Sequence, residues 1–218
     1  QIIAHYYRPG TMAHRILVEH SECVARLALV LADRYSDTKI DRELLYRAAM
    51  LHDIGIIYTD ATTISCYGRE PYIRHGYLGA CLLRRDWGLE AHAQVCERHT
   101  GSGVSEEERI ALRLPLPAGR SYLPETLEEK LVCYADCFYS KTHLDRRRAT
   151  KRCVQRWRLF GKKESPDLWP GLLHALRLCI RCLEIPPNPY RGRRAYHLSN
   201  ATMVRCFRLW VGEAPRSS

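Results

Sequence analysis

The pair His52-Asp53 stands at the end of an apolar helical stretch, and a metal ion could bind both side chains. Neighbouring side chains point about 100° apart on an α-helix, so both reach one ion only where the helix ends and the backbone turns. Gly55 follows two residues later, and we expect it to permit that turn. The pair therefore predicts a metal site at a helix end.

Four further side chains occupy similar places, on the inward face or at the end of a predicted helix. They are His20, His75, His99 and Asp136. A lone inward histidine usually belongs to a core, but four imidazoles and two carboxylates together suit one or two ions of Mn, Fe, Co, Ni or Zn. A buried carboxylate such as Asp136 also needs a cation, because an isolated one costs several kcal/mol. The set has no cysteine, which argues against a closed structural zinc site.

Apolar residues recur with helical spacing in five stretches, and no stretch of useful length alternates like a strand. The five stretches are 15–35, 42–53, 72–85, 91–98 and 127–139, and further helices are predicted at 146–160, 168–185 and 199–211. Asp41 can cap the second stretch, and Thr126 with Glu129 forms a capping box for the fifth. Successive candidate ligands are separated by 32, 23, 24 and 37 residues, enough for one helix and its connection. We therefore expect an all-α fold whose helices converge on one centre.

These residues resemble the HD-domain superfamily of metal-dependent phosphohydrolases, in particular its small bacterial HDIG-type subgroup. The resemblance covers residues 12–160 and rests on His20, on His52-Asp53-Ile54-Gly55 and on Asp136, with support from 97–101 and 124–130. It implies an HD-domain helical bundle with a metal centre between its helices. The ligands that it implies for one ion are His20, His52, Asp53 and Asp136. By similarity to binuclear members, His75 and His99 would hold a second ion, with Asp53 as the bridge.

The resemblance also implies an activity, the hydrolysis of a phosphate mono- or diester of nucleotide type by a metal-activated water. Many binuclear relatives carry Lys directly after HDIG, whereas this chain has Ile56, which puts a cyclic-dinucleotide phosphodiesterase in doubt. Arg98, Lys141 and Asp60 are candidates to take the role of that lysine, because they lie near the motif residues in the sequence. The alternative is that they are ordinary surface charges. We predict that Arg98 and Lys141 bind the substrate and that both act in catalysis with Asp53.

The basic charge of the protein lies in its last third. Residues 1–145 contain 17 Lys and Arg against 20 Asp and Glu, whereas residues 146–218 contain 17 against 4. We expect 161–218 to form a basic C-terminal extension, helical or partly disordered. Two other functions stay open: a metal-containing nucleotide-binding or signalling module without turnover, and nucleic-acid association through 146–163 and 191–194.

Cysteine usage and hydropathy predict the compartment. Most of the ten cysteines stand in apolar helical patterns, as reduced structural thiols do, and the lone Cys179-Ile-Arg-Cys182 motif is a weak zinc or redox signal. No run approaches the roughly 18 to 20 apolar residues of a membrane helix, and residues 1–10 lack a signal pattern. We expect a cytoplasmic protein with a small phosphorylated substrate and no membrane segment.

Overall fold

The computed structural model describes residues 1–34 and 40–142, and helices predominate in this part of the chain, as the predicted all-α class requires. It contains the helices α1 (Ile2–Tyr6), α2 (Met12–Arg34), α3 (Arg42–Leu51), α4 (His75–Trp87), α5 (Glu90–Arg98), α6 (Glu106–Ala111) and α7 (Leu127–Asp136). The helices predicted after residue 145, the CxxC motif and the extension 161–218 lie outside the described residues. The domain boundaries at 12–160 and 161–218 therefore stay predictions.

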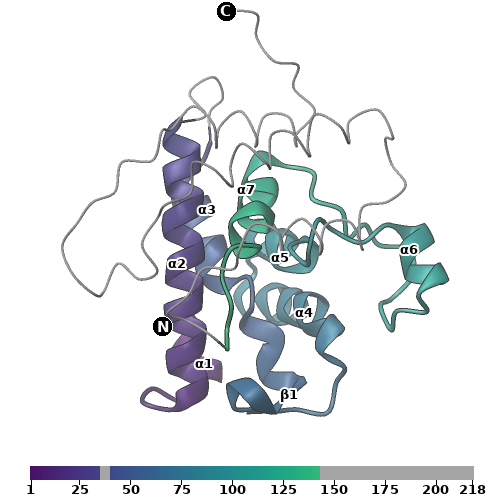
Figure 1. Ribbon diagram of the computed structural model, residues 1–218, viewed down its shortest axis with the longest axis horizontal. Helices are drawn as coiled ribbons and strands as arrows, with labels where there is room; N and C mark the ends of the chain where they lie inside the picture. The colour runs from purple at the N-terminus through teal and green to yellow at the C-terminus, as the bar shows by residue number, and fades with distance from the viewer. Residues whose placement is uncertain (35–39, 143–218) are drawn as a thin grey trace, which may run out of the picture.

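The long helix α2 organises the bundle. Figure 1 shows it running along one side of the described part, with α3, α5 and α7 beside its upper half and α4 near its lower half. α2 packs on α3 and α7, α3 and α7 both contact α5, and α5 packs along α4. Apolar side chains from α2, α3 and α7 fill the largest core cluster, including Leu31, Leu45 and Leu131. Burial of such side chains supplies the main driving force that holds the helices together.

The predicted helix starts are confirmed by their capping bonds. Asp41 accepts a hydrogen bond from the amide of Leu44 at 2.9 Å, at the start of α3. Thr126 and Glu129 form the predicted capping box of α7, and Ser105 and Glu108 form another at α6. These side chains satisfy amides that a helix leaves without partners in its first turn.

The segment between α3 and α4 is compact and largely irregular. It contains three short 3-10 helices, η1 (Ile54–Tyr58), η2 (Thr62–Ile64) and η3 (Tyr72–Arg74), and the two-residue strands β1 (Asp60–Ala61) and β2 (Cys66–Tyr67). β1 and β2 pair antiparallel, with Asp60 opposite Tyr67. Residues 57–70 thus form a loop with a minimal hairpin. The segment begins directly after His52-Asp53 and ends at His75.

Three glycines let η1, α4 and α5 approach one another closely. A Cβ atom added to Gly55 would lie 2.2 Å from the carbonyl oxygen of His75 and 2.3 Å from the amide nitrogen of Gly79. A Cβ atom on Gly79 would lie 2.5 Å from Sγ of Cys96, and one on Gly76 would meet the Cys96 carbonyl oxygen at 2.6 Å. Gly55 does not have a positive φ. The prediction that Gly55 permits a backbone turn is therefore wrong. Gly55 instead makes room for the close approach of α4.

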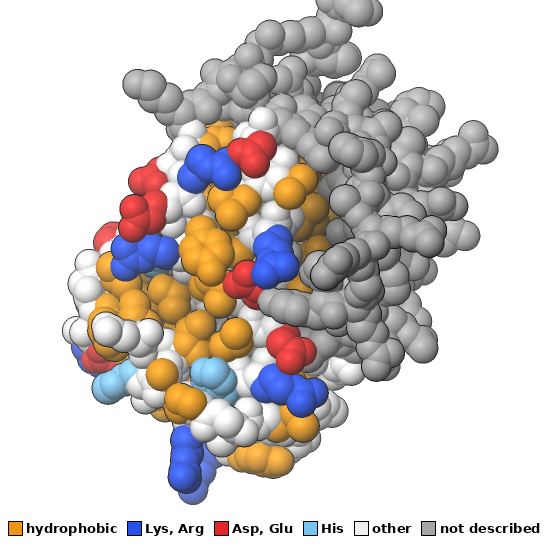
Figure 2. All heavy atoms as spheres, turned by 90° about the vertical axis from the view of Figure 1, so that its left-hand side faces the viewer, with side chains coloured by type: hydrophobic (Ala, Val, Ile, Leu, Met, Phe, Trp, Pro, Cys, Tyr) orange, Lys and Arg blue, Asp and Glu red, His pale blue; other side chains and the backbone are white. Residues whose placement is uncertain are grey.

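The surface, the hydropathy of the helices and the cysteines each bear on a prediction made from the sequence. Figure 2 shows one face with hydrophobic side chains gathered across its middle and charged side chains around them. None of the described helices is both long enough and apolar enough to cross a bilayer. The six cysteines of the described residues are free thiols, as predicted.

Candidate metal centre

The six candidate ligands come from five segments and meet in the interior. His20 lies within α2, His52 and Asp53 directly follow α3, His75 begins α4, His99 directly follows α5, and Asp136 ends α7. All six are buried, with at most 4% of each residue exposed. They form two groups that share Asp53: His20, His52, Asp53 and Asp136 in one, and Asp53, His75 and His99 in the other. The structure therefore brings together every residue that was predicted to bind metal.

The first group gathers around one oxygen atom from each of two carboxylates. Nε2 of His20 lies 3.2 Å from Oδ2 of Asp53 and 3.0 Å from Oδ1 of Asp136. Nε2 of His52 lies 3.1 Å and 3.7 Å from the same two oxygens. Ligands bound to one ion at about 2.1 Å in a tetrahedral arrangement are separated by about 3.4 Å. The spacing of the first group therefore fits a single transition metal ion.

The second group uses the other oxygen of the same carboxylate. Nε2 of His75 and Nε2 of His99 each lie 3.4 Å from Oδ1 of Asp53. The two Nε2 atoms are 3.0 Å apart. Asp53 thus presents Oδ2 to one pair of histidines and Oδ1 to the other. A carboxylate in this position can bridge two ions.

Backbone carbonyls fix the orientation of three of the imidazoles. Nδ1 of His52 contacts the carbonyl oxygen of Ala49 at 2.6 Å, and Nδ1 of His75 contacts that of Tyr72 at 2.6 Å. Nδ1 of His99 contacts the carbonyl oxygen of Cys96 at 2.7 Å. A carbonyl only accepts, so each Nδ1 carries a proton and Nε2 of each ring faces the centre, where it offers a lone pair to a metal ion once Nε2 is deprotonated. In every case the carbonyl belongs to the third residue before the histidine.

The lone pairs and charges of the centre call for cations. The Nε2 lone pairs of neutral His75 and His99 face each other at 3.0 Å, an arrangement that a cation between them would stabilise. Burial lowers the pKa of His75 to about 3, so this ring stays neutral. Burial also opposes protonation of His52, but Asp53 and Asp136 outweigh it and raise the pKa of His52 to about 10. The donor set of imidazole nitrogens and carboxylate oxygens therefore fits one or two divalent transition metal ions.

Lys141 lies beside the first group. Its Nζ atom is 2.6 Å from Oδ2 of Asp53 and 3.9 Å from Oδ1 of Asp136, and only 13% of the side chain is exposed. Burial works against the charged form of Lys141, but Asp53, Tyr72 and Asp136 raise its pKa above the ordinary value. The side chain therefore stays an ammonium group at neutral pH. Of the helpers considered from the sequence, Lys141 is the one that reaches the centre.

The position after HDIG belongs to the core instead. Ile56 is 2% exposed and lies in an apolar cluster with Tyr7 and Ile54. A lysine there would have to bury its charge among apolar side chains, which is costly. In this fold, position 56 is filled by an apolar side chain, and Lys141 places a cation beside the centre instead.

Arg98 and Asp60 have other surroundings than the sequence led us to expect. Nη1 of Arg98 lies 3.1 Å from Oε1 of Glu129 and 3.0 Å from Oε2 of Glu125, and thereby joins the end of α5 to the start of α7. Asp60 is exposed in β1, where its amide donates to the carbonyl of Glu70. The contacts of Arg98 explain a structural role, so we leave Arg98 and Asp60 out of the proposed catalytic set.

Tyr72 is a residue of the centre that the sequence did not single out. Its ring stacks on His75 with 4.6 Å between ring centroids, and its carbonyl accepts the bond from His75 Nδ1. The residue is 38% exposed, so it reaches the surface. The spacing of three residues before the histidine was a signal, because Ala49 and Cys96 have the same relation to His52 and His99. Any residue type can supply a carbonyl, so side-chain identity hides this signal.

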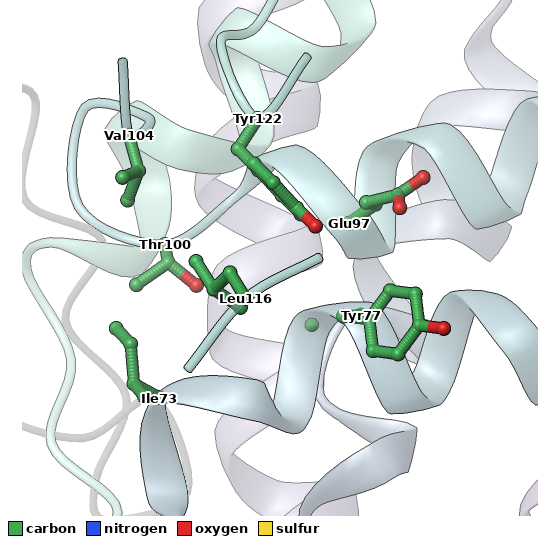
Figure 3. A pocket seen from close by; sticks show the side chains of 8 residues that line it. Ile73, Tyr77, Glu97, Thr100, Val104, Leu116 and Tyr122 are labelled. Atoms are coloured by element: carbon green, nitrogen blue, oxygen red, sulfur yellow. The ribbon is translucent and has the colours of Figure 1, made fainter. Parts of the chain in front are cut away.

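Residues of α4 and α5 contribute to the lining of a small pocket. Figure 3 shows it between Ile73, Thr100 and Val104 on one side and Tyr77 and Glu97 on the other, with Leu116 and Tyr122 nearby. None of the six candidate ligands lines it. The buried Glu97 carboxylate is bound to Arg84 at 2.8 Å and to Arg120 at 3.2 Å. Glu97 therefore holds a structural ion-pair network.

Comparison with known proteins gives a family and several relatives. Residues 17–140 match the HD domain. An uncharacterized protein of Methanocaldococcus jannaschii is 39% identical over 122 residues, which cover 55% of this chain and 64% of that protein. A tRNA (cytidine(56)-2'-O)-methyltransferase of Picrophilus torridus is 35% identical over 166 residues, 76% of this chain and 41% of that protein. The same enzyme of Thermoplasma volcanium is 30% identical over 151 residues, 69% of this chain and 39% of that protein.

The chain spans less than two thirds of the length of each of these relatives. They come from archaea, so the bacterial origin and the HDIG subgroup suggested by the resemblance are not what the comparisons establish. No solved structure matches the chain. The HD match covers more than half of the chain and includes His20, His52, Asp53, His75, His99 and Asp136. This protein therefore belongs to the HD domain family.

Proposed function

We propose that this protein is a metal-dependent phosphohydrolase that hydrolyses a small phosphate mono- or diester of nucleotide type. In this proposal His20, His52, Asp53 and Asp136 hold one divalent ion, while Asp53, His75 and His99 hold a second. The observation that carries the proposal is the sharing of Asp53, whose two oxygens each face a separate pair of buried histidines. Mn, Fe, Co, Ni and Zn all suit imidazole and carboxylate ligands.

The ions and the protein have different tasks in this reaction. When bound, the ions activate water for attack on phosphorus and stabilise negative charge on the phosphoryl oxygens. The carbonyls of Ala49, Tyr72 and Cys96 keep three histidines in the ligand tautomer. Burial of the centre limits access of bulk water and so strengthens its electrostatic interactions.

Lys141 is the proposed substrate-binding and catalytic side chain. Its ammonium group lies at the edge of the centre, within 2.6 Å of Asp53, and remains protonated at neutral pH. From this place Nζ can bind a phosphoryl oxygen or donate a proton to the departing oxygen. Tyr72 offers a partly exposed aromatic ring next to His75, where a nucleobase could stack.

The test combines metal analysis with an activity panel. Protein purified without chelator is expected to contain a transition metal, and to hydrolyse some of a panel of nucleotides and model phosphate esters with Mn or Ni. His52→Ala should reduce turnover more than about 100-fold, beyond the range seen when only a partner of a ligand is lost. His92→Ala is the matched control, because His92 is a buried histidine of α5 outside both groups. Absence of metal, or unchanged turnover in His52→Ala, would refute the proposal.

A second candidate places the phosphate ester on RNA. Two relatives are named tRNA methyltransferases. One of them aligns with 166 residues of this chain, which is more than the number of residues that lie outside the HD match at 17–140. That alignment must therefore include part of the HD domain. The panel should therefore include tRNA carrying terminal or ribose 2'-phosphates. Faster phosphate release from tRNA than from free nucleotides would favour this candidate. Tight nucleotide binding with no turnover would instead favour the alternative of a signalling module.

Nucleic-acid association through 146–163 and 191–194 stays a prediction, since both stretches lie outside the described residues. Its expected mark is a steep loss of RNA affinity as salt increases, because basic side chains that neutralise phosphates release counterions. A flat salt dependence would exclude that mode of binding.

A further inference from the structure

We propose that Tyr7 is a positioning residue of the metal centre, which holds the backbone turn after Asp53 in the geometry that two ions require. This inference rests on the proposed metal centre and extends it to a residue that precedes the HD match at 17–140. Tyr7 directly follows α1 and lies outside both ligand groups. Its hydroxyl group nevertheless contacts the segment that carries Asp53.

The Tyr7 hydroxyl bridges two backbone groups of η1. It donates a hydrogen bond to the carbonyl oxygen of Ile54 at 3.1 Å and accepts one from the amide of Ile57 at 2.9 Å. Tyr7 is 2% exposed, so water does not readily replace these bonds. Burial raises the pKa of the phenol above its ordinary value, and the hydroxyl group therefore remains a neutral donor. The bridge fixes the residue that directly follows Asp53.

Close packing against α4 also restrains η1. Gly55 lies against the backbone of His75 and Gly79, with no space for a side chain. Tyr7 and α4 thus both hold the same short segment. The ring of Tyr7 also packs with Ile54 and Ile56 in one apolar cluster.

Small movements of this segment would affect both ligand groups. Oδ2 of Asp53 lies 3.1 Å from His52 Nε2, and Oδ1 lies 3.4 Å from both His75 and His99. A carboxylate that binds two ions tolerates little displacement, since functional sites need their ligands held within about 0.5 Å. Loss of the hydroxyl bridge should therefore weaken binding of both ions together. A loss confined to general stability would leave their affinities alone.

The chain offers a matched control in the neighbouring tyrosine. The Tyr6 hydroxyl donates to Asp86 at 2.7 Å and accepts from Nε1 of Trp87 at 3.0 Å, and thereby fastens α1 to the end of α4. Tyr6→Phe removes hydrogen bonds from the same helix region, but none that reaches η1. Tyr7→Phe keeps the buried ring and removes only the bridge.

The experiment compares the wild-type protein with Tyr7→Phe and Tyr6→Phe. Mn affinity is measured by calorimetry, and the ligand field by the visible absorption of Co-loaded protein. Tyr7→Phe should bind Mn about tenfold more weakly, as for other groups that orient a ligand, and shift the Co bands. Tyr6→Phe should keep the wild-type affinity and spectrum even if its melting temperature falls.

Wild-type affinity and an unchanged Co spectrum in Tyr7→Phe would overturn the role of Tyr7 and leave the metal centre standing. Failure of the wild-type protein to bind Mn or Co would overturn the metal centre and this inference with it. If Tyr7→Phe does not fold, a variant with 4-aminophenylalanine at position 7 replaces it in the comparison. The amino group of this residue can still donate a hydrogen bond to the carbonyl oxygen of Ile54. Its weaker acceptor for the Ile57 amide should again lower Mn affinity, and an unchanged affinity would contradict the proposal.

Discussion

The two oxygens of Asp53 face different surroundings. Oδ2 lies among His20, His52 and Lys141, with the second carboxylate, Asp136, nearby, whereas Oδ1 lies closest to His75 and His99 among the described residues. The Oδ2 side is therefore rich in negative charge and already attracts protons and an ammonium group. The Oδ1 side is a pair of neutral imidazoles that depends on the shared carboxylate for its negative charge.

This difference predicts an order of metal binding. The Oδ2 side offers two carboxylates to a cation, and burial from water makes each of them more effective. The Oδ1 side offers only its share of one. We therefore expect the first ion to bind at the Oδ2 side with higher affinity and the second ion to bind more weakly.

The largest effect is expected from Asp53→Asn, which removes the charge that both sides use. Both ions should be lost from the purified protein, and turnover should fall to background, because neither ion keeps its bridging ligand. Metal content by plasma mass spectrometry and phosphate release check this outcome. Asp60→Asn changes an exposed aspartate seven residues away and should leave both values unchanged. Retention of two ions by the Asp53→Asn variant would contradict the bridging role.

A comparison of His20→Ala with His99→Ala separates the two sides. His20→Ala should weaken binding of the tighter ion, whereas His99→Ala should leave one tight ion and lose the weaker one. Turnover should fall by about 100-fold or more in both, since two ions act on the same phosphoryl group. Calorimetric titration with Mn distinguishes them. Identical titration curves for the two variants would show that the sides are not independent.

Lys141→Met tests the cation beside the Oδ2 side. The variant should keep both ions, or bind the tighter one more strongly, because the ammonium group no longer competes for Asp53. Its kcat should fall roughly 100-fold, the usual loss when one group that stabilises developing charge is removed. Lys130→Met, on α7, is the control and should be neutral. A loss of metal with unchanged kcat per bound ion would assign Lys141 to structure instead.

Much of this centre could be predicted from the sequence. All six candidate ligands were found because their residue types are rare on inward helix faces, and their spacing matched one helix each. The reason for Gly55 could not be found in the same way, because it depends on the backbone of α4, which is distant in sequence. Arg98 was singled out by its proximity to His99, yet the end of a helix directs neighbouring side chains apart. Its partner Glu129 lies 31 residues further along the chain.

A smaller effect is expected in the protonation of the imidazoles on the two sides, and it can be measured by spectroscopy. In chelator-treated protein, the carboxylates raise the pKa of His52 to about 10, while burial lowers that of His75 to about 3. Between pH 5 and pH 8, about the range in which an unperturbed histidine titrates, His52 should therefore stay protonated and His75 neutral. Nitrogen-15 NMR of the imidazoles checks this directly. Titration of either ring near its ordinary pKa of about 6.5 would contradict the charge difference between the sides.

Anomalous diffraction can show whether the Asp53 carboxylate bridges two ions. Crystals of the protein grown with Mn should give two anomalous peaks at the Mn edge, one on each side of the Asp53 carboxylate. One peak should lie about 2.1 to 2.3 Å from Nε2 of His20 and His52, and the other at similar distances from Nε2 of His75 and His99. A single peak, or peaks that do not contact Asp53, would show that Asp53 does not bridge two ions.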